Sequence, residues 1–333
     1  MLQATLLNLI KQLQHRKIMV IGDMVADVYL EGKIARISRE APVLILEHTA
    51  ETVVPGGASN AVHNTATLGG CVYAVGVVGE DFAGQELARI LQSKTVETAG
   101  LILDTSRPTI TKTRVMAGGQ ATVRQQIVRI DKENKQALTA DIEQTVTDYI
   151  ARHILDMDAV VISDYGSNTI TPRIIANVLE ACHRARIPCM VDSRYNIMAY
   201  HGVTVVKQNE SEAAKAVGYD IVDQATLLSA GKTILETLDA QAVLISRGPD
   251  GMSLFEKTGK VTHITVTNKS EVYDVTGAGD TVVATMILAL AAGASYEHAA
   301  RLSNFAAGIV VKKPGTATTT PDELCQAINE HFE

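Results

Sequence analysis

The chain has 333 residues, 46% hydrophobic and 20% charged, so it can bury a sizeable core and does not resemble a disordered protein. Its formal net charge of -7 argues against nucleic acid as the main partner, because binding a phosphate backbone needs a surplus of Lys and Arg. No run reaches the ~20 apolar residues of a membrane span, and the N-terminus lacks signal-peptide features. We therefore expect a cytoplasmic protein with no membrane partner and with four free cysteines.

The predicted elements begin with a buried strand over residues 17–23. Residues 24–54 and 107–131 show short alternating segments with little helical periodicity, which predicts antiparallel strands. The other expected elements are, in chain order, a helix from 56, a strand from 71, a helix over 82–93, a helix over 141–153, a strand over 159–164, a helix over 172–185, strands over 188–192 and 203–209, helices over 210–217 and 224–238, a strand over 242–248, a hairpin over 252–267, two final helices and a short tail.

Strands that alternate with helices imply a mostly parallel sheet covered on both faces, so the fold class is α/β with three α/β/α layers. The two β-rich inserts, about 24–54 and 107–131, interrupt this pattern. We expect them to pair into a small β-sheet standing off the main body, as a lid over a site, a dimer surface, or both. No linker or repeat divides the chain, and we predict a single domain over residues 1–333.

The most informative motif is Gly277-Ala278-Gly279-Asp280, which lies between a β-like segment and a long apolar helix. Glycines let backbone N–H groups point at an anion, and the helix N-terminus adds partial positive charge. These residues are therefore candidates for an anion hole around a transferred phosphate, with Asp280 as general base for a hydroxyl. For the motif alone, an ordinary tight turn with Asp280 as a capping carboxylate is clearly the better explanation, and only the other motifs favour catalysis.

Two further segments predict sugar contacts. Gly56, Gly57 and Asn60 lie in a small-residue segment that would let a ligand approach the backbone while the amide bonds its hydroxyls, although helix packing explains it as well. Asp23 and Asp27 follow a strand, at the edge where ligands bind in open parallel sheets. Asp23 is a candidate clamp for two hydroxyls, whereas Asp27 is also typical of a surface residue.

A third group predicts nucleotide contacts. Asn209 and Glu212 are three residues apart at a helix start, where they are candidates to order phosphates and a hydrated Mg²⁺, although the helix dipole alone favours acidic residues there. The other candidate ATP contacts lie on a glycine-containing turn, which is equally typical of a plain hairpin, and on the last helix: Ser246, Arg247, Gly248, Gly251, Asn304 and Gly308. The chain has no Walker A motif and no protein-kinase motifs, which excludes those classes.

Taken together in this order, the segments resemble the ribokinase-like (PfkB) family of carbohydrate kinases, from Ile18 to about Leu324. The most specific match is the motif over 274–280, supported by Pro55-Gly56-Gly57. The resemblance implies a ribokinase-like fold, ATP-dependent phosphorylation of a sugar hydroxyl with Asp280 as the base, and Mg²⁺ held by Glu212 through water. It also implies an activating monovalent cation such as K⁺ near Asp274 and the turn over 313–316.

A finer resemblance is to the kinase domain of bacterial heptose 7-phosphate kinases, carried by the segments over 36–43, 108–115, 163–165 and 271–276. Those enzymes phosphorylate the anomeric hydroxyl of D-glycero-D-manno-heptose 7-phosphate on the route to ADP-heptose for lipopolysaccharide, and some are fused to a nucleotidyltransferase. This implies a phosphosugar substrate and a separate nucleotidyltransferase in the same pathway. The chain departs from the family pattern at Gly166-Ser167-Asn168, Ser193-Arg194 and Lys207-Gln208.

A substrate that already bears a phosphate needs a cationic anchor, and Arg is well suited to bidentate phosphate contacts. The cationic residues of the two inserts are Arg36, Arg39, Lys112, Arg114, Arg124 and Arg129. Among them Arg36, Lys112 and Arg114 are candidate substrate contacts, together with Asp164 from the segment over 163–165. Charged residues on exposed strands are equally typical of a solvated edge. Arg194 and Lys207 are candidates for phosphate contacts, or they mark a subgroup with a different phosphosugar.

Three functions remain open at this point: a heptose 7-phosphate kinase, a related kinase of another phosphosugar or a nucleoside, and a catalytically silent sugar- or nucleotide-binding regulator on the same fold. The retained Asp280 and its glycines argue against the silent regulator. If the small sheet leaves an apolar face uncovered, we expect a homodimer through it.

Overall fold

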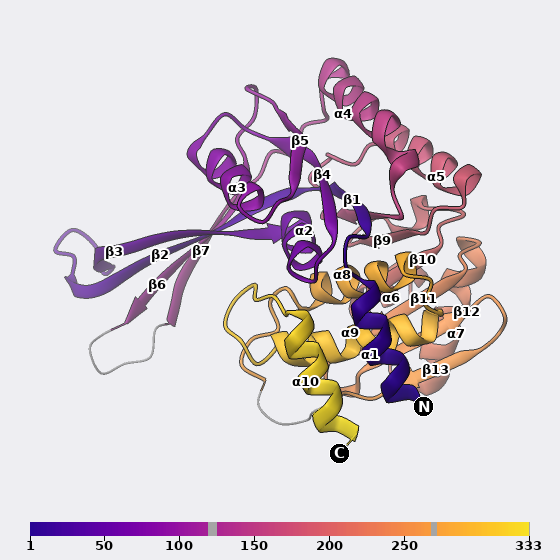
Figure 1. Cartoon of the computed structure of the whole chain (residues 1–333). Coiled ribbons are helices and arrows are strands. Elements are labelled where there is room, and N and C mark those ends of the chain that lie inside the picture. Colours follow the sequence, from indigo (N-terminus) through magenta and orange to yellow (C-terminus); the bar gives the residue numbers. More distant parts are fainter. Residues whose placement is uncertain (119–124, 268–271, 333) are drawn as a thin grey trace.

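The computed structural model describes residues 1–118, 125–267 and 272–332 and contains two sheets (Figure 1). Within these residues the large sheet has nine strands, which are parallel to their neighbours except at β11–β12 and β12–β13. In spatial order they are β13 (Val261–Ile264), β12 (Met252–Glu256), β11 (Ala242–Ser246), β10 (Val205–Asn209), β9 (Cys189–Ser193), β8 (Ala159–Asp164), β1 (Lys17–Gly22), β4 (Cys71–Val78) and β5 (Glu97–Leu103).

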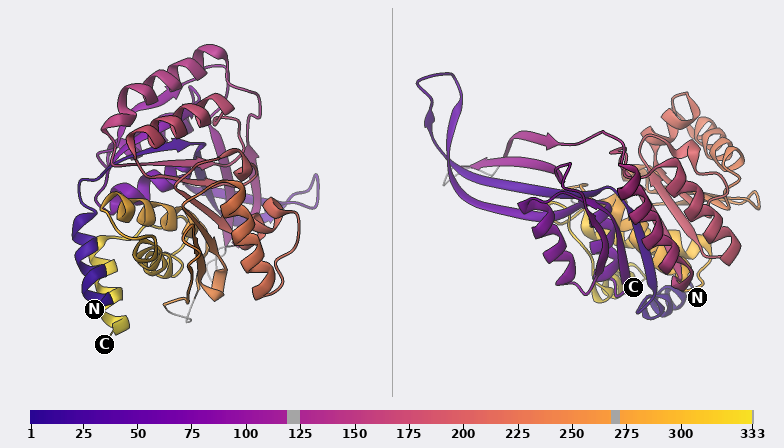
Figure 2. Two further views of the ribbon diagram at one scale, coloured as in Figure 1. Left: turned by 90° about the vertical axis from the view of Figure 1, so that its right-hand side faces the viewer. Right: turned by 90° about the horizontal axis from the view of Figure 1, so that it is seen from above.

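Helices cover both faces of this sheet, so the layers are α/β/α (Figure 2). The strands are continuously apolar because alternate residues enter different cores: Ile18 and Val20 of β1 face one core, and Met19 and Ile21 face the other. The first core is covered by α1 (Leu2–Gln12), α2 (Ala58–Thr67), α3 (Phe82–Gln92), α8 (Ala278–Ala291), α9 (Tyr296–Val310) and α10 (Pro321–Phe332), and the second by α4 (Ala140–His153), α5 (Pro172–Ala185), α6 (Glu210–Val217) and α7 (Gln224–Thr237).

The small sheet has the order β3 (Leu44–Gly57), β2 (Met24–Ile37), β6 (Ile110–Gly118) and β7 (Gln125–Lys132). It pairs the two β-rich inserts, as predicted, through a parallel β2–β6 contact flanked by two antiparallel pairs. It projects from the body as an elongated arm in both Figure 1 and Figure 2. Strands β2 and β3 are buried where they meet the body and exposed toward the far end. Its role as a lid and the single-domain organisation stay predictions.

Three local predictions were wrong. The edge strand β5 was missed because half of its residues face solvent and its pattern is weak. The expected tail is the helix α10, which packs beside α1 through Leu324 and Ile328 (Figure 1). Asp280 is the third residue of α8, whose N-cap is Gly277, so Asp280 is not the capping residue.

The strand order reverses direction between β1 and β8, because β4 and β5 lie on one side of β1 while β8, β9, β10 and β11 follow on the other. Loops that leave the carboxyl ends of strands at such a point diverge and form a crevice where ligands bind. The segments that follow β1 and β8 begin with Asp23 and Tyr165, so the topology points to this edge as the site. No helix within the described ranges combines the length and apolarity needed to cross a membrane.

Candidate active site

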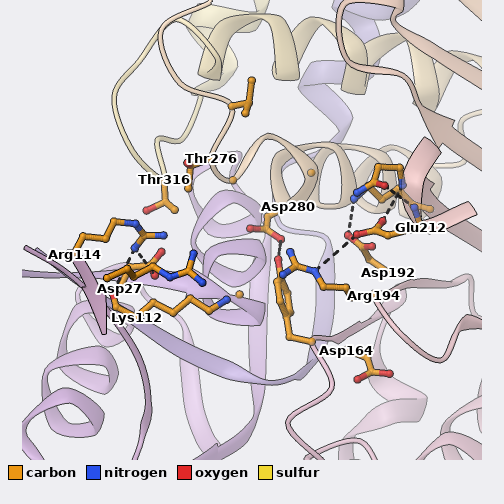
Figure 3. Close-up of a pocket in the computed structure, with 18 residues that line it drawn as sticks. Asp27, Lys112, Arg114, Asp164, Asp192, Arg194, Glu212, Thr276, Asp280 and Thr316 are labelled. Carbon is orange, nitrogen blue, oxygen red and sulfur yellow. Dashed lines mark hydrogen bonds and ion pairs between the residues drawn. The ribbon is translucent and has the colours of Figure 1, made fainter. Parts of the chain in front are cut away.

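A cavity of about 360 Å³ lies between the carboxyl edge of the large sheet and the base of the small sheet (Figure 3). Its walls come from three parts of the chain. The small sheet contributes Asp27, Gly57, Lys112, Arg114 and Arg129. The strand ends of the large sheet contribute Asp164, Tyr165, Asp192, Arg194, Lys207, Asn209 and Glu212. The start of α8 and a neighbouring turn contribute Val275, Thr276, Gly277, Gly279, Asp280 and Thr316. A cavity lined by so many charges suits a polar, anionic ligand.

Asp280 is the buried acid at the centre of this cavity, with 6% of its surface exposed. Its Oδ2 accepts a hydrogen bond from Asn60 Nδ2 at 2.8 Å, and its Oδ1 accepts one from the Tyr165 hydroxyl at 2.8 Å. Burial raises the pKa of Asp280 to about 6, although these two hydrogen bonds oppose the shift. A carboxylate with a pKa near neutral is matched to the work of a general base.

The glycines before Asp280 are required by close approach. Gly277 has a left-handed φ of 80°, and a Cβ there would lie 2.7 Å from Asn60 Nδ2. A Cβ at Gly279 would lie 2.7 Å from Lys207 Nζ. The amide of Ala278 donates to the Val275 carbonyl at 3.3 Å, so that amide would have to share its hydrogen with an anion. The anion hole therefore stays a prediction, with Gly277 and Gly279 as its better donors.

Lys207 brings a fixed positive charge to the start of α8. It is 5% exposed, and its ammonium lies 2.8 Å from Asp192 Oδ2 on the neighbouring strand. Burial alone would lower the pKa of Lys207, but Asp192 and Glu212 outweigh it and the pKa is raised. The charged lysine therefore faces the same space as Asp280, where a transferred phosphate would gather negative charge.

Asn209 and Glu212 form a capping box at the start of α6. Asn209 accepts from the Glu212 amide at 2.8 Å, and Glu212 Oε2 accepts from the Asn209 amide at 2.9 Å. The second oxygen of Glu212 lies 3.8 Å from Arg194 Nε. Asn209 and Glu212 therefore do stabilise the start of a helix, which was the alternative to a role in binding. Both residues also line the cavity.

The donor set fits a hydrated Mg²⁺. Glu212 keeps one carboxylate oxygen that no backbone amide occupies. Within the described parts of the chain, no group of three or more His, Cys, Asp or Glu side chains could enclose a metal. Mg²⁺ is commonly held through one or two carboxylates, water and substrate phosphates, and does not need such a cage.

The small sheet forms a cationic wall opposite Asp280 (Figure 3). Arg114 is already paired with Asp27 at 2.8 Å, and a Cβ at Gly56 would lie 2.7 Å from the Asp27 carboxylate, which explains that glycine. Lys112 is different, because no carboxylate in the described residues forms an ion pair with it. Burial lowers the pKa of Lys112, the positive charge of Arg194 adds to the effect, and the carboxylates of Asp27 and Asp131 oppose it without cancelling it. A cation in such surroundings favours a bound anion.

Several predicted substrate residues lie outside the cavity wall. Arg36 and Arg39 are exposed on the outer part of the small sheet, whereas Arg124 and Glu271 fall outside the described residues. Asp23 is 0% exposed, and burial raises its pKa. Its Oδ2 accepts from the amides of Tyr165 and Ser167 at 2.8 and 3.1 Å. In this structure Asp23 therefore holds the loop after β8, and its role as a sugar clamp stays a prediction.

Asp164 lines the cavity but is already fully engaged. One of its oxygens accepts from the hydroxyls of Ser193 and Tyr200, each at 2.8 Å, and the other accepts from the amide of Gly166 at 2.9 Å. These bonds tie the end of β8 to that of β9. A structural role accounts for the residue completely.

The other predicted ATP residues fall into two groups next to the cavity. Ser246 pairs in register with Asn209, and Arg247 Nε lies 3.2 Å from Glu210 Oε2, so this turn adjoins the capping box. The same turn holds Gly248 and Gly251 around a short 3-10 helix. Asn304 and Gly308 lie on α9, where Asn304 donates to the Thr265 carbonyl at 2.8 Å. None of these lines the cavity of Asp280.

The two segments expected to hold a monovalent cation do lie together. Asp274 accepts from the amides of Thr276 at 2.9 Å and Gly315 at 3.0 Å. Burial would raise the pKa of Asp274, but these bonds lower it overall, so the carboxylate is ionised. An ionised carboxylate beside the turn over 313–316 is compatible with a bound cation, although each of its oxygens already accepts a hydrogen bond from a backbone amide.

Five cavity residues were not among the predicted site residues: Tyr165, Asp192, Val275, Thr276 and Thr316. Tyr165 directly follows β8, so the strand-end rule that selected Asp23 could have found it as well. Asp192 lies opposite Lys207 in the β9–β10 register, which only the strand order reveals.

The fold and the cavity around Asp280, with Lys207 beside it, are those expected of a sugar kinase. Comparison with known proteins gives the family. The model of the pfkB family of carbohydrate kinases matches residues 15–323, and the chain belongs to this family. It is 42% identical over 317 residues to the bifunctional protein HldE of Geobacter sulfurreducens and 41% identical over 317 residues to that of Trichlorobacter lovleyi. These matches cover 95% of this chain but only 64% and 63% of the relatives, so the chain spans less than two thirds of their length.

Solved structures confirm the ribokinase-like fold. Phosphofructokinase-2 from Escherichia coli, in complex with substrates and products, has a TM-score of 0.76 at 20% identity, with 96% of this chain and 100% of that chain covered. Arabidopsis thaliana ribokinase, complexed with ribose and ATP, has a TM-score of 0.72 at 19% identity, with 95% and 99% covered. The expected separate nucleotidyltransferase stays a prediction, since the relatives bear a bifunctional name.

Proposed function

We propose that this chain uses ATP to phosphorylate the anomeric hydroxyl of D-glycero-D-manno-heptose 7-phosphate, giving the 1,7-bisphosphate, with Asp280 as the general base. The observation that carries the proposal is the environment of Asp280, a buried carboxylate with a pKa of about 6 in a cavity that also holds Lys207 and, on the opposite wall, Lys112. The resemblance of the segments over 36–43 and 108–115 to heptose 7-phosphate kinases and the 42% identity to a protein named HldE support the choice of sugar.

In the proposed reaction, Asp280 takes the proton of the anomeric hydroxyl. The freed oxygen forms a bond to the γ-phosphorus of ATP, and the bond from that phosphorus to the β–γ bridging oxygen breaks. ADP leaves with the bonding electrons. The base would contribute ~10²–10⁴-fold. Lys207 and the start of α8 would stabilise the charge on the transferred group, which is the larger part of phosphoryl-transfer catalysis.

ATP would lie with its phosphates toward Asn209 and Glu212 and extend past the turn over 246–251 toward Asn304 and Gly308. Bound Mg²⁺ offsets the phosphate charge in such kinases, and Glu212 would hold it through water. A potassium ion near Asp274 would order the turn beside α8.

The cationic wall of the small sheet would bind the phosphate that the sugar already carries. Lys112 is the leading candidate because no carboxylate of the described chain forms an ion pair with it, whereas Arg114 is paired with Asp27. Arg129 lines the same wall, although its guanidinium also lies 2.8 Å from Asp131. A bound phosphate would therefore contact Lys112 first and Arg129 second.

The outer part of the small sheet would form a homodimer with a second copy of this chain. It exposes apolar side chains that a monomer leaves in water: Ile34, Ile37, Val43, Leu44, Ile127, Val128 and Ile130. Exposed apolar patches are a feature of protein interfaces.

The function is tested by measuring ADP release from Mg²⁺-ATP with D-glycero-D-manno-heptose 7-phosphate, the same heptose without its phosphate, sedoheptulose 7-phosphate, fructose 6-phosphate, ribose and adenosine. Selective turnover of the heptose 7-phosphate supports the proposal. Selective turnover of another phosphosugar would reassign the substrate and direct attention to Arg194 and Lys207. An absence of turnover with every compound would favour the silent regulator.

A further inference from the structure

Tyr165 is a cavity residue that the proposed reaction leaves without a task. It directly follows β8 at the reversal of strand order, and its amide donates to Asp23 Oδ2 at 2.8 Å. Its hydroxyl donates to Asp280 Oδ1 at 2.8 Å. The buried Asp23 therefore fixes the backbone of the residue that touches the base.

Two cations hold the ring of Tyr165. The Arg194 guanidinium lies 4.8 Å from the ring centroid, and the Lys112 ammonium lies 5.3 Å from it. Both distances are within the ~6 Å range of cation–π attraction. In Figure 3 the Lys112 side chain extends from the small sheet toward the side of the cavity where Arg194 and Asp280 lie. The aromatic ring thus links the cations of the anion-binding wall to the base.

The carboxylate of Asp280 is fixed by one donor on each oxygen. Asn60 donates from α2, and Tyr165 donates from the loop after β8. The charged groups that face it are Asp192 of β9 and Lys207 of β10. Each carboxylate oxygen has two lone pairs, so a sugar hydroxyl can bind Asp280 while the Tyr165 hydroxyl stays bonded.

The phenol remains a donor at any working pH. Burial and the adjacent Asp280 raise the pKa of Tyr165 well above its usual value, so the hydroxyl keeps its proton. A hydrogen bond to the charged form of an acid favours that form. The Tyr165 hydroxyl therefore opposes the effect of burial on the pKa of Asp280.

We propose that Tyr165 is a positioning residue for the general base: its hydroxyl orients the Asp280 carboxylate and keeps it ionised, while Lys112 and Arg194 hold its ring. The inference rests on the proposed function, because it assigns Asp280 the role of base. The aromatic ring of Tyr165 has its own part in this role, because it contacts the two cations. Tyr165 also lines both the main cavity and a smaller one that is lined by Lys135 and Tyr195.

The test is the pH profile of ADP release with the phosphosugar that the enzyme accepts. Tyr165→Phe keeps the ring and removes the hydroxyl. We expect kcat to fall by about 10- to 100-fold, a fraction of the ~10²–10⁴ of a full general base. We also expect the acid limb of kcat/KM to move up by about one pH unit. KM values should change by less than about threefold, because the cations keep their aromatic support.

Two further variants separate positioning from packing. Tyr165→Leu removes the ring too, and we expect the KM for the phosphosugar to rise as well, since Lys112 and Arg194 lose their contact. Tyr195→Phe is the matched control: Tyr195 is 72% exposed, and its variant should retain the wild-type kcat and pH profile.

If Tyr165→Phe does not fold, 3-fluorotyrosine at position 165 replaces it. Its more acidic hydroxyl is a stronger donor, so the acid limb should move to lower pH. An unchanged acid limb in whichever of the two variants is folded would overturn the inference.

Asp280→Asn is measured alongside. If it is inactive while Tyr165→Phe behaves as wild type, only the role of Tyr165 fails. If Asp280→Asn turns over normally, the proposed base fails, and the role of Tyr165 fails with it.

Discussion

The carboxyl edge of the large sheet and the wall of the small sheet face each other across one cavity, but their charges are arranged differently. On the large sheet each charged group has a partner: Lys207 pairs with Asp192, and Asp280 is held by Asn60 and Tyr165. On the small sheet Lys112 has no ion-pair partner within the described chain. The paired edge suits chemistry, which needs fixed geometry, and the wall that carries Lys112 suits capture of an anion.

The two sheets also differ in burial. Every residue of β8 is buried, whereas every residue of β7 is exposed. Strands packed on both faces hold their side chains rigidly, while an exposed strand moves at little cost. The comparison predicts that substitutions at the large-sheet edge change kcat and stability, and that substitutions in the small sheet change substrate affinity or assembly.

The largest effect is expected from Lys207→Met. It removes the charge beside the start of α8 and leaves Asp192 buried without its partner. We expect kcat to fall by at least about 10²-fold and the free energy of unfolding to fall by about 3–5 kcal/mol, measured by urea denaturation. In the double variant with Asp192→Asn, stability should recover and activity should not. Full activity in Lys207→Met would remove the large-sheet edge from the chemistry.

Lys112→Met sharpens the other side of the comparison. A hydrogen bond to a charged group is worth about 1.5–3 kcal/mol, so KM for the phosphosugar should rise by about 10- to 100-fold while kcat stays near wild type. Turnover of the sugar without its phosphate should not change. Lys33→Met, which removes an exposed lysine of β2, is the control and should leave KM unaltered. An equal loss with both sugars would show that Lys112 does not bind the phosphate.

The pH dependence of the wild-type enzyme follows from Asp280. Its protonated form cannot accept a proton, and burial raises its pKa to about 6. Below that pH, kcat/KM should fall about tenfold for each pH unit, and above it the profile should level off. Steady-state rates between pH 4.5 and 8 measure this. A flat profile from pH 5 to 7 would contradict the assignment of the base.

The smallest catalytic effect is expected on the outer part of the small sheet. Ile130 is 55% exposed, and Ile130→Lys should weaken self-association while changing the free energy of unfolding by no more than about 0.5 kcal/mol. Sedimentation at several concentrations measures the mass. Phe82→Lys, on exposed α3 of the body, is the control and should leave the mass unchanged. A wild-type chain that is monomeric throughout would contradict the dimer.

Periodicity predicted most strands and helices because the large sheet is buried on both faces and its runs are continuously apolar. It failed for β5, an edge strand with solvent on one side, and for α10, whose apolar residues are few. The pairing of the two inserts was also predicted, because alternation over 24–54 and 107–131 excludes a helix there.

The site was predicted less completely, because its contacts join distant parts of the chain. Asp280 was selected from its glycine motif, but its donors Asn60 and Tyr165 are 220 and 115 residues away. The strand-end rule located Asp23 correctly, yet it says nothing about the direction of a side chain, and Asp23 points into the protein. The Lys207–Asp192 pair depends on the β9–β10 register, which no local pattern encodes.

The most direct test of the account is the kcat of Asp280→Asn with ATP and the accepted phosphosugar at pH 8, measured together with its unfolding free energy. A raised carboxyl pKa means that stability falls as pH rises from about 4 through about 6, so removing the charge should leave the fold at pH 8 intact or more stable. We predict a folded protein whose kcat is lower by about 10²–10⁴-fold. A folded Asp280→Asn variant with near-normal kcat would contradict the account.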